Sequence, residues 1–300
     1  MIVFASSITD PEAYRCCAER GFARAAEPDS EVLANAAAGS IFRSYNLILD
    51  MVAERDDVEA LVLVHQDAEI ASGDFCATLR GALSDPGVGV VGCAGAVGVR
   101  SIAWWEGSVT WASFTHRYPE LGGGDLPALT WQPDSLPAFA HKGEVDTVDG
   151  VLLALSPWVV KNVRFDESLG QLHGYDFDFC LQVRAAGRKV VTEHLPVVHH
   201  HSLDLVSNPE TWIAAHMRIA EKWAGRMPDV GTAGGNWEQR ARRAEAEASL
   251  ARTEAFAGMQ HADAKIAQLE RRLDEVAGST SWRVTAPLRR LNALRRRSSR

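Results

Sequence analysis

Acidic side chains at short spacing follow an apolar run in the segment His65-Gln66-Asp67-Ala68-Glu69. The run before them, Ala60–Val64, is continuous and of strand length, as expected for a strand buried on both faces. In an open parallel sheet, ligands bind outside the carboxyl ends of the strands. Oxygen ligands at such an end suit Mg²⁺ or Mn²⁺, which neutralises the charge that develops on a leaving nucleoside diphosphate. The sequence therefore predicts a metal and diphosphate site here.

A second pair of carboxylates, Asp176 and Asp178, stands at the predicted start of a helix that ends at Gly187. Acidic residues in a first turn are favoured by its unpaired backbone N–H groups, so a charged helix start is one interpretation. The preceding loop, His173-Gly174-Tyr175, is aromatic and ionisable, which a simple helix start does not need. The segment is therefore a second candidate site.

Strand and helix patterns alternate along the first 225 residues and predict a parallel α/β sheet. The predicted strands are 2–6, 22–26, 60–64, 88–92, 147–154 and 189–191. One predicted helix begins with the cap and first turn at residues 10–12, and the others are 40–54, 74–83, 176–187 and 209–223.

Residues 101–147 interrupt this alternation and hold four tryptophans, Trp104, Trp105, Trp111 and Trp131. A long irregular segment inside a compact domain is usually functional or a small subdomain. Exposed tryptophans would suit stacking against sugar rings. The alternative is an irregular hairpin that covers one edge of the sheet.

Composition narrows the class of protein. The chain has 300 residues, 46% of them hydrophobic, and a net charge of −8. The negative charge lies in the body, which argues against a nucleic-acid binder. Five cysteines without a CxxC pair predict reduced thiols in a cytoplasmic protein. The first residues do not resemble a signal peptide, and no apolar run reaches membrane-spanning length.

The last 74 residues are organised differently. Residues 1–226 form the predicted catalytic-type domain, 227–235 a Pro/Gly-rich linker, 236–277 a coiled-coil helix with 4,3-spaced apolar residues, and 278–300 a basic amphipathic tail. We expect a homo-oligomer through 236–277, the alternative being one long helix packed on the body. Seven arginines and no acidic residue lie in 283–300, which predicts peripheral contact with an anionic membrane or, alternatively, a solubilising tail.

Together these motifs resemble family 2-type inverting glycosyltransferases of the GT-A fold. The resemblance covers about residues 1–205 and is carried by Ile2–Ser6, the helix with Tyr45-Asn46, Leu61–Glu69, Asp149-Gly150 and Phe165–Leu181. It is closest to a bacterial branch with His-Gln-Asp in place of D-x-D. The C-terminal part looks like extensions on bacterial surface-polysaccharide glycosyltransferases. The resemblance implies a mixed, mostly parallel sheet flanked by helices.

The resemblance also implies roles for the metal site. Asp67 matches the aspartate that contacts metal and diphosphate, and His65 replaces the first acid of the D-x-D. Glu69 is a further candidate ligand. A histidine of 199–201 would complete the site. We favour His201 or His199, since alternate residues of a strand share a face; the other interpretation is surface histidines.

For the reaction itself, the resemblance makes Asp176 the general base that takes the proton from the acceptor hydroxyl. Asp178 would instead support the helix start. Tyr175 stands where many members have Glu, and with Trp131 and His173 it is a candidate contact for the acceptor. The expected nucleotide-sugar site comprises Ser6, Ser7, Glu27, Asn46, Gln66, Asp67, Asp149 and Gly150.

The expected function is transfer of a sugar from a nucleotide-diphosphate sugar to a glycan or lipid-linked acceptor, with Mg²⁺ or Mn²⁺ as cofactor. A nucleotidyltransferase shares the sheet and metal logic, but it would usually show a Gly-rich phosphate loop after the first strand. A degenerate scaffold that acts through its coiled coil is a third possibility. A zinc enzyme is disfavoured because three adjacent histidines cannot all face one ion.

Overall fold

The computed structural model describes residues 1–36, 38–118, 125–127, 141–200, 208–225, 227, 262 and 265–286. The chain divides into two compact units, Met1–Ala241 and Arg242–Arg300. Within the described residues, none of the helices is long and apolar enough to cross a membrane. Apart from Met227, the predicted linker 227–235 lies outside the described residues.

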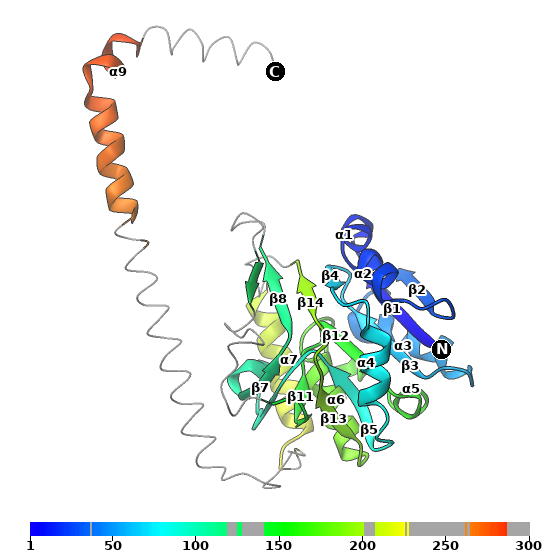
Figure 1. Ribbon diagram of the computed structural model, residues 1–300. Helices are drawn as coiled ribbons and strands as arrows, with labels where there is room; N and C mark the ends of the chain where they lie inside the picture. The colour runs from blue at the N-terminus through cyan, green and yellow to red at the C-terminus, as the bar shows by residue number, and fades with distance from the viewer. Residues whose placement is uncertain are drawn as a thin grey trace. The chain divides into compact units, whose positions relative to one another are not determined.

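A seven-stranded sheet forms the centre of the first unit (Figure 1). β1, β2 and β3 run parallel, and β13 runs parallel to β5; β12 lies antiparallel between β3 and β5. The predicted mixed, mostly parallel sheet is thus confirmed. In sheet order the strands are β10 (Glu144–Val145), β13 (Lys189–Thr192), β5 (Val88–Gly92), β12 (Leu152–Leu155), β3 (Ala60–Val64), β1 (Ile2–Ile8) and β2 (Glu31–Ala36).

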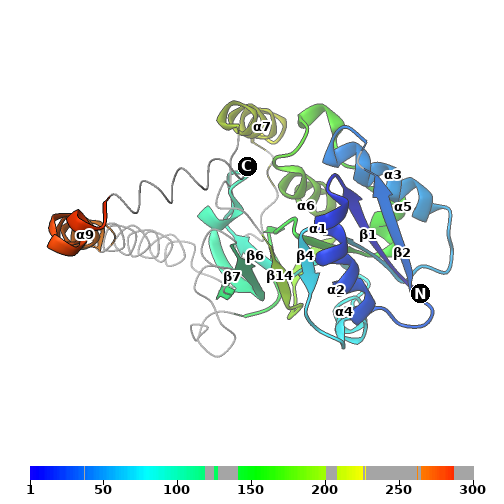
Figure 2. The same ribbon diagram turned by 90° about the horizontal axis from the view of Figure 1, so that it is seen from above.

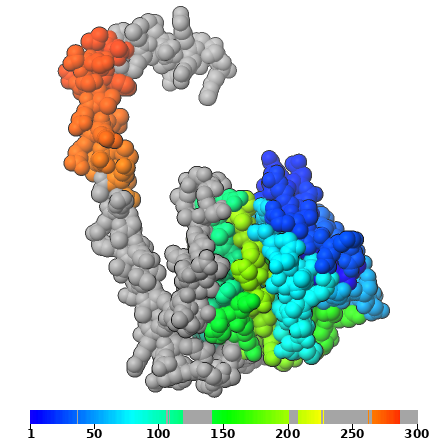
Figure 3. Space-filling model, in the orientation of Figure 1, coloured from blue at the N-terminus to red at the C-terminus, as the bar shows by residue number. Residues whose placement is uncertain are grey.

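Helices cover both faces of this sheet (Figure 2). Phe4 of β1 packs against Phe22 of α2 and Phe75 of α4, with ring centroids 5.4 and 5.8 Å apart. The described helices of this unit are α1 (Pro11–Cys16), α2 (Ala18–Ala25), α3 (Ile41–Ala53), α4 (Phe75–Ala82), α5 (Pro157–Asn162), α6 (Tyr175–Ala185) and α7 (Pro209–Lys222). Figure 3 shows α1 and α2 (blue), α4 (cyan) and the region of β14 (yellow-green) as one continuous surface.

Two smaller sheets replace the irregular segment expected at 101–147. One contains β11 (Thr147–Val148), β6 (Ala94–Val97) and β7 (Ser108–Ala112); the other contains β4 (Ala68–Ile70), β14 (Val197–His199), β8 (Phe114–Arg117) and β9 (Asp125–Pro127). Trp104 is buried in the short 3-10 helix Trp104–Glu106, whereas Trp105 is 51% exposed. Residues 128–140 lie outside the described part.

The prediction of a strand at 22–26 is wrong. These residues belong to helix α2, because Ala18, Phe22 and Ala25 recur at helical spacing with Gly21 and are all buried. Gly21 is required there, since a Cβ would lie 2.3 Å from the backbone nitrogen of Ile70. The second strand is β2, whose residues alternate between half-buried and exposed.

The single strand expected at 147–154 is interrupted. β11 pairs with β6, whereas β12 pairs with β3 and β5, and residues 149–151 turn between the two sheets. Since β12 is antiparallel to β3, its beginning lies at the carboxyl end of β3, where the His65 N–H donates to the Val151 carbonyl over 3.1 Å. The interruption therefore brings Asp149 and Gly150 to the edge where ligands were expected.

Asp178 joins α6 to α7. Its buried carboxylate lies 2.8 Å from the Lys222 ammonium group and accepts hydrogen bonds from the Trp223 indole N–H at 2.7 Å and from the Gln182 amide at 2.7 Å. A buried charge that accepts this many bonds holds two elements together. The second acid of the Asp176/Asp178 pair therefore supports the fold.

We expect Asp178→Ala to lower the free energy of unfolding by about 3 kcal/mol or more, because it leaves a lysine and an indole N–H without their buried partner. Urea unfolding followed by tryptophan fluorescence measures this. The matched control is Asp166→Asn, which removes the charge of the other carboxylate on Lys222, 31% exposed, but keeps an oxygen for the Ser168 N–H. It should cost under about 1 kcal/mol. Equal losses in the two variants would contradict this assignment.

The second unit contains a helix over 265–278, and then Ser279 caps the short helix α9 (Thr280–Val284) by accepting a hydrogen bond from the Trp282 N–H. One stripe of the first helix is apolar and at least half exposed: Ile266, Leu269, Leu273 and Val276. Residues 242–261, 263–264 and 287–300 are outside the described part.

Candidate active site

Three metal-ligating side chains meet at the carboxyl end of β3. His65 and Asp67 follow this strand directly, and His199 ends β14. β14 pairs antiparallel with β4 so that His199 lies opposite Ala68, the residue after Asp67. One ligand atom from each of His65, Asp67 and His199 lies within 4.8 Å of the others. The pairing of two short strands thus completes a site whose members are over 130 residues apart in sequence.

Charge distribution around Asp67 fits a cation site. Burial acts to raise the pKa of Asp67, but the hydrogen bond with His199 and the proximity of His65 outweigh it and hold the pKa well below its usual range. The Asp67 carboxylate lies 3.5 Å from His199 Nε2 and 4.0 Å from His65 Nδ1. Two imidazoles and an ionised carboxylate are a donor set that first-row divalent metals such as Mn²⁺ accept. The residues present therefore fit the expected metal.

Gln66 fixes the loop that begins after β1. Its amide oxygen accepts hydrogen bonds from the backbone N–H groups of Thr9 and Asp10, both over 2.8 Å, and its amide nitrogen donates to Thr9 Oγ1. The His-Gln-Asp element therefore divides its work. His65 and Asp67 belong to the His65–Asp67–His199 cluster, while Gln66 stabilises the wall of the neighbouring pocket.

That pocket has a volume of about 590 Å³ and opens beside the cluster. It extends from the loop after β1 to the start of α3 and the loop before α6. Its lining residues are Ser7, Thr9, Gly39, Ser40, Ile41, Tyr45, His65, Gln66, Asp67, Gln171, Leu172 and His199. The Ile41 N–H donates to the Gln171 carbonyl over 2.9 Å and joins the two far walls. The sequence does not predict Ile41 and Gln171 as pocket residues, because contacts between loops from distant segments leave no local pattern.

Asp176 lies in the first turn of α6, where Gly150 N–H donates to one carboxylate oxygen and its neighbour Phe177 N–H to the other, each over 2.9 Å. Burial of the carboxyl group and then the negative charge of Asp149 raise the pKa of Asp176 from 3.8 to about 7. The residue is still partly exposed. A partly exposed carboxyl group whose pKa lies near neutral pH has the properties of a general base.

Asp149 is held by two donors. Its oxygens accept hydrogen bonds from the indole N–H of Trp104 over 2.8 Å and from the Val151 N–H over 2.7 Å. Trp104 therefore has a structural role in the site that its sequence context does not reveal. Asp149 stays beside Asp176 as a fixed neighbouring charge.

The structure does not support Tyr175 as an acceptor contact. The residue is 5% exposed, and its ring packs edge-on against Phe42 and Tyr45. Its hydroxyl lies 2.5 Å from His65 Nε2. Tyr175 therefore lies behind the metal cluster, and the helix that carries Asp176 begins there.

Several expected nucleotide-site residues have other contacts. Ser6 is fully buried and donates to the Val64 carbonyl, whereas Ser7 lines the pocket. Asn46 binds the backbone of Phe165 and fixes the segment before α6. Neither Ser6 nor Asn46 is among the residues that line the pocket.

The two glutamates of the prediction also have other partners. Glu27 forms a two-oxygen ion pair with Arg80 and is not among the pocket-lining residues. Glu69 pairs with Arg24 at 2.7 Å and approaches His200 at 3.7 Å, and it does not belong to the metal cluster. In strand β4 its side chain alternates away from the buried Ala68 and Ile70.

Other predictions stay open. His201 and Trp131 lie outside the described residues. His173 is half-buried, and burial lowers the pKa of its imidazole. It is not among the residues that line the pocket, and its contact with an acceptor stays a prediction.

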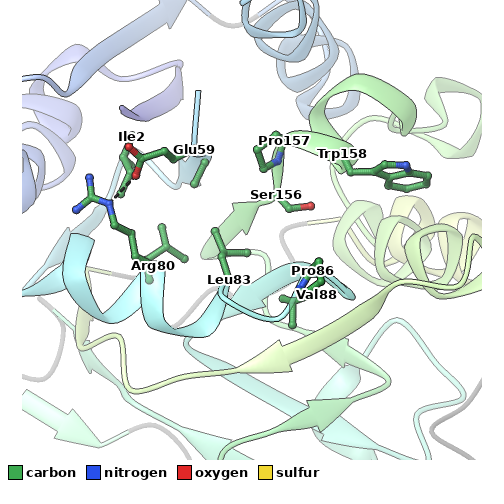
Figure 4. Close-up of a pocket in the computed structure, with 11 residues that line it drawn as sticks. Ile2, Glu59, Arg80, Leu83, Pro86, Val88, Ser156, Pro157 and Trp158 are labelled. Carbon is green, nitrogen blue, oxygen red and sulfur yellow. Dashed lines mark hydrogen bonds and ion pairs between the residues drawn. The ribbon is translucent and has the colours of Figure 1, made fainter. Parts of the chain in front are cut away.

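A second pocket of about 370 Å³ lies at the opposite edge, where β1, β3 and β5 begin (Figure 4). Its lining is mostly apolar, and its charged residues Arg80 and Glu59 pair with each other over 2.5 Å. No histidine lines it. The side chains capable of chemistry therefore gather at the other edge of the sheet.

Comparison with known proteins agrees with this arrangement. A family model described as "Glycosyltransferase like family" matches residues 3–216, which include the sheet, the metal cluster and Asp176. The chain belongs to this glycosyltransferase-like family. The prediction of a family 2-type glycosyltransferase is confirmed, whereas the His-Gln-Asp branch and the inverting mechanism stay predictions.

Among curated proteins, this glycosyltransferase-like chain is similar to the streptomycin biosynthesis protein StrF of Streptomyces griseus, with 29% identity over 191 residues. The match covers 61% of this chain and 60% of that relative. Among solved structures, the mannosyltransferase PcManGT from Pyrobaculum calidifontis, in complex with GDP-Man and Mn²⁺, matches at 16% identity with a TM-score of 0.46 over 94% of this chain and 81% of that one. GalNAc-T7 with UDP, GalNAc and Mn²⁺ matches at 11% identity with a TM-score of 0.48. That match covers 75% of this chain and 48% of the other.

Replacing Asp149 by Asn should lower the pKa of Asp176 by about one unit, because it removes the neighbouring negative charge that disfavours ionisation. Carboxyl-carbon NMR titration of the full chain measures this. The wild type should titrate near pH 7. Asp85→Asn, which removes an exposed acid paired with Lys189, is the control and should leave that titration unchanged. An unchanged midpoint in the Asp149→Asn variant would show that Asp149 does not tune Asp176.

Proposed function

We propose that this protein is an inverting glycosyltransferase that moves a sugar from a nucleotide-diphosphate sugar to an acceptor hydroxyl. One observation carries this proposal: a carboxyl group with a pKa near 7, at Asp176, occurs together with the His65–Asp67–His199 cluster. Tyr175, the residue before Asp176, contacts His65 of that cluster. The carboxyl group can accept a proton, and the cluster can hold a cation beside a pocket of nucleotide size. Membership of the family supports the same reaction.

In the proposed reaction, the acceptor oxygen attacks the anomeric carbon while the bond from that carbon to the diphosphate oxygen breaks. Asp176 takes the proton from the attacking hydroxyl, and the bonding pair leaves with the nucleoside diphosphate. Attack opposite the leaving group inverts the anomeric configuration. The Gly150 and Phe177 N–H groups orient the Asp176 carboxylate for this step. A divalent cation would stabilise the diphosphate as it leaves.

We propose Mn²⁺ rather than Mg²⁺ as the metal. Mg²⁺ prefers oxygen ligands in strict octahedral geometry, whereas the described cluster offers two imidazoles and one carboxylate. His65, Asp67 and His199 would hold the ion. Since the cluster adds only one carboxylate charge, we expect nucleoside diphosphate to contribute to metal binding.

The competing functions are less well supported. A degenerate scaffold would not need three ligand atoms within 4.8 Å of one another at the carboxyl end of β3. A nucleotidyltransferase would usually carry a Gly-rich phosphate loop after the first strand, and the segment Ala5–Thr9 does not form one.

For the acceptor, we propose a glycan or lipid-linked sugar in surface polysaccharide synthesis, at the inner face of the membrane. The arginine-rich end of the chain and the 43% exposed Trp282 support a membrane-linked acceptor. A soluble small-molecule glycoside is the second candidate, because the relative StrF is named for streptomycin biosynthesis. Transfer to a lipid-linked but not to a soluble small-molecule acceptor would favour the first.

Two variants separate the proposed roles. Asp176→Asn should reduce transfer at least 1000-fold, while nucleoside-diphosphate binding measured by calorimetry persists, because only the base is lost. Asp67→Ala should abolish metal-dependent binding, and in the wild type Mn²⁺ should support binding at lower concentration than Mg²⁺. Full turnover by Asp176→Asn would exclude this base. Binding that EDTA leaves unchanged would exclude the metal role.

We also propose that the second unit pairs with a second copy in parallel. Ile266, Leu269, Leu273 and Val276 have the 3,4 spacing of a and d positions, and all are at least half exposed. In a parallel pair Lys265 would face Glu270 of the other copy, whereas an antiparallel pair would bring Lys265 near Arg272. Charge thus favours the parallel pair. Parallel pairing would put both arginine-rich ends on one side, where they bind an anionic surface together.

The double variant Leu269→Glu/Leu273→Glu should convert the full chain from dimer to monomer in light scattering, since it puts charges in the apolar stripe. Its binding to vesicles with anionic lipid should fall about tenfold or more. Ala267→Glu/Gln268→Glu adds the same charge at outward positions and is the control. Lys265→Glu should weaken the dimer, and adding Glu270→Lys should restore it. A monomeric wild type would contradict the pairing.

A further inference from the structure

The position of the Tyr175 hydroxyl is fixed from every side. Its ring contacts Phe42, Tyr45 and Phe165, with centroids 5.8 to 6.1 Å away. A Cβ at Gly150 would lie 2.1 Å from the hydroxyl oxygen. The helix start that carries this tyrosine therefore presents one oxygen at a defined point.

The Tyr175 hydroxyl oxygen lies next to one nitrogen of His65. The Tyr175 oxygen lies 2.5 Å from His65 Nε2, while His65 Nδ1 faces Asp67 at 4.0 Å. A neutral imidazole carries its proton on one nitrogen and offers a lone pair on the other. Only the tautomer with the proton on Nε2 leaves Nδ1 available on the side of Asp67 and His199.

We propose that Tyr175 is a positioning residue that accepts the Nε2–H of His65 and so fixes His65 in the tautomer whose Nδ1 serves as a metal ligand. This deepens the proposed function, on which it rests. Outer hydrogen bonds of this kind orient a ligating imidazole, and their loss usually weakens metal binding 10- to 100-fold. Tyr175 touches neither the reacting atoms nor the pocket, so its effect passes through His65.

The arrangement also separates metal binding from proton transfer. Gly150 contacts both neighbours in α6: its N–H binds Asp176, and its missing Cβ makes room for Tyr175. Removing the tyrosine oxygen leaves the Asp176 contacts with Gly150 and Phe177 in place. Loss of the hydroxyl should therefore raise the Mn²⁺ concentration needed for half-maximal transfer and leave kcat at saturating Mn²⁺ within about threefold.

The first test is Mn²⁺ binding to the full chain, followed by electron paramagnetic resonance at a fixed concentration of nucleoside diphosphate. Tyr175→Phe should weaken Mn²⁺ binding at least tenfold. Tyr14→Phe, which removes another buried tyrosine hydroxyl away from the site, should not. Equal affinity in wild type and Tyr175→Phe would overturn the inference while leaving the proposed function intact. A wild type that binds no Mn²⁺ would overturn both.

A double-mutant cycle tests whether the effect passes through His65. In a His65→Ala background, Tyr175→Phe should cause no further loss of Mn²⁺ affinity, because the group that it positions is gone. Additive losses would show that Tyr175 acts by another route and would overturn the inference.

The tautomer itself can be observed without any variant. Long-range proton–nitrogen NMR of histidine-labelled wild type, free of metal, should show His65 protonated at Nε2. Tyr175→Phe should show a mixture of tautomers, a change that a purely structural role would not produce. Protonation at Nδ1 in the wild type would overturn the inference even if the variant fails to fold.

Discussion

The close contact at Gly150 is the constraint on which the site depends. A Cβ there would overlap the Tyr175 hydroxyl at 2.1 Å, and the same residue's N–H binds Asp176. Because the chain turns at 149–151, it leaves one sheet and enters another within three residues. That turn fixes the approach of α6 to the carboxyl end of β3. Asp176 and Tyr175 both approach this one residue without a side chain.

Electrostatics then divides the carboxylates by role. Asp67, beside two histidines, is kept ionised, which suits a cation ligand. Asp176, buried beside Asp149, is held near the point where it can gain or lose a proton at neutral pH. Asp178 compensates its burial with a lysine and an indole N–H and stabilises the junction of α6 with α7. Environments that move the pKa values of neighbouring acids in opposite directions are a usual mark of assigned roles.

The sequence predicts the sheet and most helices correctly, because these depend on local periodicity. It also places Asp67 just after a strand and Asp176 at a helix start, where the structure has them. The prediction fails where distant segments decide the outcome. Phe22 was placed in a strand although Ala18, Gly21 and Ala25 complete a helical face. His199 enters the cluster only through the pairing of β14 with β4, and Glu69 leaves it through the same pairing and Arg24. No single stretch of sequence contains that information.

The two departures from the family pattern, His65 for the first acid of D-x-D and Tyr175 for Glu, are hydrogen-bonded to each other. A glutamate at 175 would add a third negative charge beside Asp149 and Asp176 and raise the cost of ionising the base. A neutral tyrosine avoids that charge. The imidazole of His65 gives the Tyr175 hydroxyl a hydrogen-bond partner on Nε2, while its Nδ1 lies on the side of Asp67. The pair removes two acids from the site and keeps a ligand atom where the metal is expected.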